Sequence, residues 1–154
     1  MKFRKMMGVT AAFLCAALAL SGCGSTDETA YRIGIVQQDE HSSLDAATQG
    51  FEDKLMELLG EENVTFDYQN AQGEQANSTT IATKFVSDGC DLILANGTTA
   101  LQSAAAATAD IPIVGTSVTD YIAAGAVNSN EKPGTNVTGV SDLGEIKADR
   151  KSVV

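Results

Sequence analysis

Short apolar runs of strand length alternate along this chain with longer segments of helical periodicity, and this alternation restricts the possible folds more than any other feature. The predicted order is strand, helix, strand, helix, strand, helix, strand, strand, with residues 119–130 as a loop or a short helix. Strands that alternate with helices favour a parallel sheet with helices on both faces. We therefore expect an open, mostly parallel α/β fold of the Rossmann or flavodoxin type. The predicted strands are 31–37, 63–68, 91–95, 111–118 and 136–140.

The helical segments carry their own start and stop signals. Ser42 is expected to cap the first helix, with Asp45 three residues further on as in a capping box. Gly60 is expected to end this helix, because glycine readily adopts the left-handed backbone found there. The second helix is expected to end before Gly89, and the third to span 99–108. The expected buried residues are Leu44, Ala47, Phe51, Leu55 and Leu58 in the first helix and Ile81, Ala82, Phe85 and Val86 in the second.

Residues 91–100, Asp-Leu-Ile-Leu-Ala-Asn-Gly-Thr-Thr-Ala, combine a strand, a turn and a helix start. Asn96 and Gly97 suit a tight turn because both tolerate backbone angles that other residues avoid. Thr98 or Thr99 is expected to be the N-cap of the next helix, whose free N–H groups would suit a carboxylate or another anion. Ligands bind at such corners in open parallel sheets. The alternative is an ordinary strand-to-helix connection that binds nothing.

Right-handed crossovers bring the strand-to-helix loops to one edge of a parallel sheet. These loops are the richest polar clusters of the chain, so their convergence predicts a ligand cleft. His41 lies in the first loop, either as an exposed residue or as a ligand contact. Glu40, Asp45 and Asp120 are carboxylates without a catalytic spacing that the sequence can establish, and capping or solvation is the expected role of Asp45. The converging loops are 38–43, 70–74, 96–99 and 117–121.

The charge of the chain excludes one class of partner. The formal net charge is -10 at pH 7, and Lys2, Arg4 and Lys5 lie in a segment that we expect to be removed. Without these three, 7 basic residues remain against 20 acidic ones, a charge of -13, which repels nucleic-acid phosphates and anionic lipid surfaces. The sequence also lacks a dinucleotide-binding glycine motif, a phosphate-binding loop and a nucleophile elbow. We therefore expect no nucleic-acid partner, no metal, no cofactor and no catalytic residues.

The first 23 residues have the pattern of a bacterial lipoprotein signal. A basic start precedes an apolar run at 9–20 that is short for a membrane span. This run ends in Leu-Ser-Gly-Cys at 20–23, like a lipobox, although a simple signal peptide cut nearby is the alternative. We expect a signal peptide at 1–22, lipidation at Cys23, a tether at 23–30 and an extracytoplasmic protein anchored to the bacterial cell membrane. Cys90 then has no disulfide partner and is expected to be a small buried hydrophobe.

Several segments together resemble a known family. Residues 33–37 (Ile-Gly-Ile-Val-Gln), 67–73 (Asp-Tyr-Gln-Asn-Ala-Gln-Gly) and 91–95 are similar to segments of bacterial ABC-transporter substrate-binding lipoproteins of the tryptophan/tyrosine-binding kind. The resemblance implies a type I periplasmic-binding fold. It also implies capture of a small solute outside the membrane, often an aromatic amino acid, and delivery to an ABC permease and its ATPase. Further similar segments are 40–41 with 44–45, 81–86, 111–114, 118–120 and 132–142.

The resemblance also implies a domain organisation. Members of this family are about twice as long and have a second α/β lobe joined by hinge crossings. We therefore expect residues 31–148 to be an N-terminal lobe whose partner lobe is missing from this sequence. Residues 149–154 have no counterpart in the family and back-translate to a common sequencing-adapter sequence, so we expect them to be a non-native tail.

Position within this lobe selects the candidate ligand-binding residues. Asn96, Thr98 and Thr99 are expected to hold a ligand carboxylate through N–H groups and hydroxyls. Asp120 or Glu40 is expected to bind a ligand ammonium. Two other functions stay open: a lipoprotein that reports ligand occupancy to a membrane receptor, and an extracytoplasmic enzyme, which would need a nucleophile or cofactor loop that is absent here. The other residues expected to line the cleft are Gln38, His41, Ser117 and Thr119.

Overall fold

The computed structural model describes residues 30–142. The predicted signal peptide, Cys23, most of the tether and the predicted tail lie outside the described residues. Within the described range, no helix is long and apolar enough to cross a membrane. Cys90 is 4% exposed, as expected for a small hydrophobe, and burial raises the pKa of its thiol.

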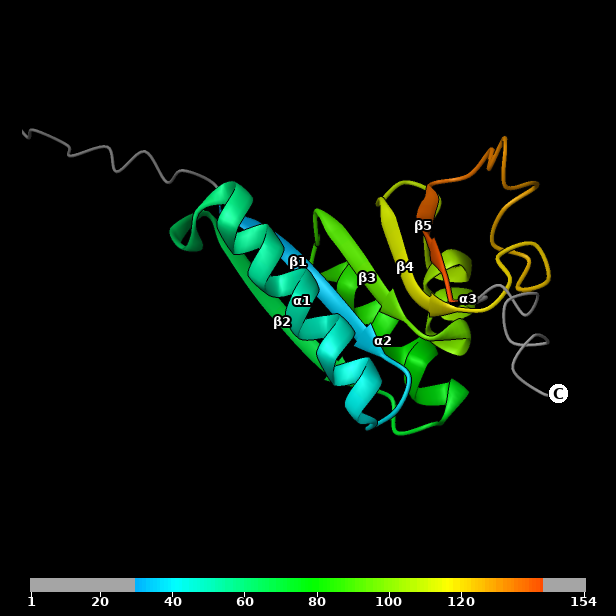
Figure 1. Cartoon of the computed structure of the whole chain (residues 1–154), viewed down its shortest axis with the longest axis horizontal. Coiled ribbons are helices and arrows are strands. Elements are labelled where there is room, and N and C mark those ends of the chain that lie inside the picture. The colour runs from blue at the N-terminus through cyan, green and yellow to red at the C-terminus, as the bar shows by residue number, and fades with distance from the viewer. Residues whose placement is uncertain (1–29, 143–154) are drawn as a thin grey trace, which may run out of the picture.

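Five parallel strands form one sheet in the order β2-β1-β3-β4-β5 (Figure 1). This sheet confirms the expected open α/β fold. The predicted ranges are close to those observed, and the first strand matches at both ends. Pro112, which lacks an N–H, immediately precedes β4 rather than lying inside it as expected. The strands are β1 (Tyr31–Gln37), β2 (Val64–Asn70), β3 (Leu92–Asn96), β4 (Ile113–Val118) and β5 (Val137–Ser141).

Helices cover both faces of the sheet. The helix α1 (Ser42–Leu59) lies on one face, in front of β1 and β2 in Figure 1, and a short 3-10 turn η1 (Glu61–Asn63) follows it. The helices α2 (Gln75–Ser87) and α3 (Thr98–Ala107) pack against each other on the opposite face. The chain between β4 and β5 forms turns, so the loop rather than the short helix is the observed form of 119–130.

The larger hydrophobic cluster lies between the sheet and the helices α2 and α3. Phe85 of α2 is fully buried, and its ring lies directly against Gly34 of β1. A Cβ added to Gly34 would be 2.6 Å from the ring, so the close approach of α2 requires glycine here. The smaller cluster lies beneath α1 and contains Ile33, Ile35, Val64 and Leu94.

The buried face of α1 is centred differently from the prediction. Thr48 is 6% exposed, whereas Leu58 is 65% exposed, so the expected burial of Leu58 is wrong. With 3.6 residues per turn, Leu58 lies about 80° around the helix from Thr48. The other four predicted residues, Leu44, Ala47, Phe51 and Leu55, are half-buried. A polar residue therefore occupies the centre of this helix face.

Candidate functional site

The carboxyl ends of the strands bring the predicted loops together. The backbone N–H of Gln38 donates to the Asn96 carbonyl at 2.9 Å, and the N–H of Gly73 donates to the Gln38 carbonyl at 2.7 Å. The N–H of Gly97 donates to the Thr116 carbonyl at 3.0 Å. These bonds join the loops after β1, β2 and β3 to the end of β4. The strand order β2-β1-β3-β4-β5 reverses direction between β1 and β3. Open sheets of this kind bind ligands at such a switch point.

The start of α3 differs from the prediction. Its N-cap is Gly97, with φ of 112°, and no side-chain hydrogen bond comes from this cap residue. Instead, the Thr99 N–H donates to Oε1 of Gln38 at 2.9 Å. The predicted threonine cap is therefore wrong, because a side chain from the neighbouring loop supplies the acceptor. Thr98 and Thr99 are half-buried in the first turn of α3.

Asn96 is fully buried, and its side chain is directed towards α1. Its Nδ2 donates to the Leu44 carbonyl at 2.7 Å and to Oγ1 of Thr48 at 2.9 Å. Its Oδ1 accepts no hydrogen bond from any of the residues that the structure describes. The Asn96 amide therefore holds α1 against the carboxyl end of β3, a role that the sequence did not indicate.

Two residues that sequence reasoning did not select, Gln37 and Thr48, complete this buried cluster. Gln37 is fully buried at the end of β1, and its Oε1 accepts a hydrogen bond from Oγ1 of Thr48 at 2.8 Å. Buried polar side chains are almost always hydrogen-bonded. Two features of the sequence could therefore have indicated this cluster: a glutamine at the end of an apolar strand and a threonine within an apolar helix face.

His41 is exposed and caps α1. Its Nδ1 accepts a hydrogen bond from the Ser43 N–H at 3.2 Å and lies 2.8 Å from Oγ of Ser43. The predicted capping pair of Ser42 and Asp45 is therefore wrong. Oδ1 of Asp45 instead accepts a hydrogen bond from Nε2 of Gln37 at 2.7 Å, because the end of β1 lies beside the first turn of α1.

The end of β4 and the loop after it carry three predicted site residues, and Ser117 is the last residue but one of the strand. Ser117 is half-buried with φ of 55°, an uncommon backbone conformation for a residue other than glycine. The carbonyl of Thr119 accepts a hydrogen bond from Oγ of Ser141 at 2.7 Å, which ties this loop to the end of β5. Oδ1 of Asp120 accepts the N–H groups two and three residues further on, at 2.9 Å each. Asp120 thus stabilises a turn and remains exposed.

Exposed carboxylates lie in three of the converging loops. Asp39 and Glu40 belong to the loop after β1, Glu74 to the loop after β2, and Asp120 to the loop after β4. Oδ1 of Asp39 accepts the backbone N–H of Glu40 at 2.8 Å, while the Glu40 side chain lies in solvent. This edge of the sheet is therefore acidic and chemically suited to a cation such as an ammonium group.

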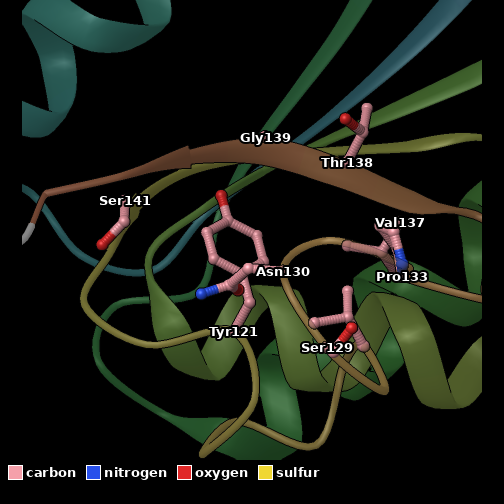
Figure 2. A pocket seen from close by; sticks show the side chains of 9 residues that line it. Tyr121, Ser129, Asn130, Pro133, Val137, Thr138, Gly139 and Ser141 are labelled. Atoms are coloured by element: carbon pink, nitrogen blue, oxygen red, sulfur yellow. The ribbon is translucent and has the colours of Figure 1, made fainter.

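Tyr121 fixes the far end of this edge. Its ring packs over two glycines, since a Cβ on Gly115 would lie 2.6 Å and one on Gly139 2.3 Å from the hydroxyl oxygen. The hydroxyl donates to the Val140 carbonyl at 3.0 Å. Burial raises the pKa of Tyr121, partly offset by this hydrogen bond. Figure 2 shows the ring beneath β5, with its hydroxyl directed at the strand and Thr138 on the other side.

An open pocket of about 230 Å³ lies beside Tyr121, between β5 and the loop that precedes it (Figure 2). A second hollow lies between α3 and the same loop, and a third beside α1 next to Gln37. None of the three is lined by any of the nine predicted ligand-binding residues. The residues around the first pocket are Tyr121, Val127, Ser129, Asn130, Pro133, Val137, Thr138, Gly139 and Ser141.

The sheet order and the polar carboxyl edge define a lobe of the periplasmic-binding-protein type. Residues 32–151 match the family described as ABC transporter substrate binding protein, and the chain belongs to this family.

Three relatives illustrate the similarity. The chain is 41% identical to a tyrosine-binding protein from Clostridioides difficile over 157 residues, which cover 92% of the chain and 45% of that protein. It is 46% identical, with a TM-score of 0.73, to the ligand-free, open structure of a substrate-binding protein with adhesive properties from Clostridium difficile, over 76% of this chain and 40% of the other. A Streptococcus pneumoniae ABC domain in complex with L-Trp is 38% identical, with a TM-score of 0.69, over 72% and 38%. The chain thus spans less than half the length of each of these relatives.

Proposed function

We propose that this chain forms one lobe of the solute-binding protein of an ABC importer and that the solute is an amino acid with an aromatic side chain. The observation that carries the proposal is family membership over residues 32–151. The choice of an aromatic amino acid is supported by the tyrosine-binding relative and by the L-Trp complex. The ligand would bind between the carboxyl edge of this sheet and a second lobe, which would close on it by a hinge motion.

The contacts of the ligand carboxylate are proposed at the start of α3. Thr99 already donates its N–H to Gln38, so a carboxylate at this position uses the hydroxyls of Thr98 and Thr99 or displaces the Gln38 amide. Asn96 supports this corner from beneath, because its amide nitrogen is engaged with α1.

The ligand ammonium is proposed to bind Asp120, with Glu40 as the second candidate. Both carboxylates are exposed in loops at this edge, and an opposite-charge contact becomes stronger when a closing cleft excludes water. Gln38, His41, Ser117 and Thr119 are proposed to line the remaining wall.

The cellular setting is part of the same proposal. The N-terminal lipid on Cys23 would anchor the protein outside the bacterial cell membrane, and an ABC permease with its ATPase would receive the solute. The acidic composition is compatible with this setting and unfavourable for a nucleic-acid partner.

The proposal is tested on the complete product of the gene by thermal unfolding with L-tyrosine, L-tryptophan or L-phenylalanine, with L-alanine as the comparison. A ligand at about 100 times its dissociation constant stabilises a protein by about 2.7 kcal/mol, so an aromatic ligand should raise the melting temperature clearly above the L-alanine value. No response to any of the three aromatic amino acids would refute the proposed ligand class.

The ammonium contact is tested with Asp120→Asn, which keeps Oδ1 as the acceptor of the turn N–H groups and removes the charge. The dissociation constant should rise about tenfold or more, as expected when a charged hydrogen-bond partner is lost. Asp110→Asn is the matched control, because Asp110 is exposed near the amino end of β4, away from the carboxyl edge. Equal affinity of both variants would refute the role of Asp120.

A further inference from the structure

We propose that Gln37 is the positioning residue of this site, because its buried amide fixes the loop after β1 relative to the loop after β3. The inference rests on the proposed function for its ligand-binding consequence. Gln37 is fully buried and is the last residue of β1, paired with the last residues of β2 and β3, Asn70 and Asn96. Gln37 is therefore located at the switch point of the sheet, where β1 and β3 end and their loops begin.

Three of the four hydrogen-bonding positions of the Gln37 amide are used. Its Nε2 donates to the Asp39 carbonyl at 2.9 Å and to Oδ1 of Asp45 at 2.7 Å. Its Oε1 accepts from Oγ1 of Thr48 at 2.8 Å, and Nδ2 of Asn96, which donates to Leu44 and Thr48, lies 3.4 Å away. A primary amide offers two donors and two acceptor lone pairs, so this set uses both donors and one acceptor position.

The orientation of this amide is determined by its partners. The two groups around Nε2, a carbonyl and a carboxylate oxygen, are acceptors, and a flipped amide would place Oε1 against both. The Asn96 amide is fixed in the same way, because its Nδ2 faces the Leu44 carbonyl. Two oriented amides thus connect β1, β3 and α1 beneath the candidate ligand surface.

The consequence for the site follows from the position of the Asp39 carbonyl. It lies between Gln38 and Glu40, so the hydrogen bond from Gln37 restrains the backbone that presents both of these predicted ligand contacts. Through Thr48, whose Oγ1 accepts from Nδ2 of Asn96, the same side chain is connected to the strand that leads into Thr98 and Thr99. Rigid supporting contacts of this kind are what hold a binding site in its productive geometry.

The decisive variant is Gln37→Glu, which preserves size and replaces a donor with an acceptor. The new oxygen would face two other acceptors, Oδ1 of Asp45 and the Asp39 carbonyl. Because these oxygens repel one another, the loop after β1 should be displaced. We expect the dissociation constant for L-tyrosine, or for L-tryptophan if that is the ligand bound, to rise about tenfold or more. Adding Asp45→Asn supplies a donor to the new carboxylate and should recover most of this loss, while Asp45→Asn alone should change affinity little.

The matched control for a merely structural role is Thr48→Val. This change removes the hydrogen bond from Oγ1 to Oε1 of Gln37 and the one that Oγ1 accepts from Asn96, and it leaves both contacts of Nε2 in place. We expect it to lower the melting temperature of the ligand-free protein while the dissociation constant stays within about threefold of wild type, a difference below 1 kcal/mol. All affinities are measured at a temperature at which every variant is folded.

The complete gene product is used throughout, and binding is measured by calorimetric titration. Unchanged affinity of Gln37→Glu, equal weakening by Thr48→Val, or no recovery on adding Asp45→Asn would each overturn the positioning role. If the wild type binds neither amino acid, the proposed ligand class fails, and positioning is then read from amide hydrogen exchange at residues 38–41. Faster exchange there in Gln37→Glu, reversed by Asp45→Asn, supports the role, and unchanged exchange overturns it.

Discussion

Gly97→Ala tests the corner between β3 and α3 most severely. The φ of 112° and ψ of 155° at Gly97 belong to a region that is essentially restricted to glycine, at a cost of about 1–3 kcal/mol for other residues. The added Cβ would lie 2.6 Å from Cβ and 2.7 Å from Oε1 of Gln38. The Gln38 side chain would then release the Thr99 N–H, a further loss of about 0.5–1.5 kcal/mol.

The smaller entropy of an unfolded chain with alanine offsets about 0.4–1 kcal/mol of this cost, so we expect a net loss of about 2–3 kcal/mol. With an m-value of about 1–3 kcal/mol/M, the urea midpoint should fall by about 1–2 M. Gly50→Ala is the control, because Gly50 is exposed in α1 with no atom within 4 Å of an added Cβ. Removal of a helical glycine should stabilise by about 0.5–1 kcal/mol.

A double-mutant cycle with Gln38→Gly separates the two causes. This change removes both atoms that crowd the added methyl group, so Gly97→Ala should cost about 1 kcal/mol less in that background than in wild type. Additive effects of the two changes would refute the clash with Gln38. A loss below about 0.5 kcal/mol for Gly97→Ala alone, a size usual for unconstrained surface positions, would refute the whole account of this corner.

Three further changes probe the rest of the lobe. Gly34→Ala would place a methyl group 2.6 Å from the ring of Phe85 and should cost about 1–3 kcal/mol in urea unfolding, a loss that Phe85→Leu should partly relieve if the clash is its cause. Tyr121→Phe should remove a loss of folding stability at alkaline pH. Because the pKa of Tyr121 is raised in the folded state, its contribution to the free energy of unfolding is complete below about pH 10 and is lost as pH rises through the folded pKa. Identical unfolding curves of wild type and variant above about pH 10 would contradict this. Asp67 accepts hydrogen bonds from Gln69 and Lys84, which lower its pKa, so its contribution to folding stability is present above about pH 4 and is lost as pH falls through the folded pKa. Asp67→Asn should therefore make the melting temperature depend less steeply on pH in that acid range. Equal slopes for wild type and variant would contradict the assignment.

The fold could be predicted because its signals are local. The run from Tyr31 to Gln37 is apolar and bounded by polar residues, and the strand lies where the pattern indicates. Gly60 and Gly89, which follow α1 and α2, both have positive φ, although the ψ of 139° at Gly60 lies outside the left-handed helical region. Alternation of such segments with right-handed crossovers then leaves few arrangements of the sheet.

The candidate site was less predictable because its side chains have partners far away in sequence. Gln38 caps a helix through Thr99, 61 residues further on, and no pattern around either residue indicates this. Asn96 was expected to face a ligand, yet its amide is directed towards Leu44 of α1. The candidate site residues could be selected from the topology of the sheet, because it places their loops at one edge. The direction of each side chain depends on tertiary contacts, which the local sequence pattern does not contain.

The role of Gln37 also could not be predicted from the local sequence. Gln37 was assigned to an apolar strand, and its role follows from Asp45 and Thr48, which converge on it only when α1 packs across the sheet. A buried glutamine at a strand end is a signal that can be sought in other sequences, because an amide in such a place requires several partners.

We propose above all that the carboxyl edge of this sheet binds an aromatic amino acid. The most direct test is a titration of the isotopically labelled complete gene product with L-tyrosine and then L-tryptophan, followed by NMR of the backbone amides. Our account predicts that, within residues 30–142, the largest shift changes fall at 38–41, 96–99 and 117–120. Changes confined to the pocket beside Tyr121, or no saturable change with either amino acid, would contradict it.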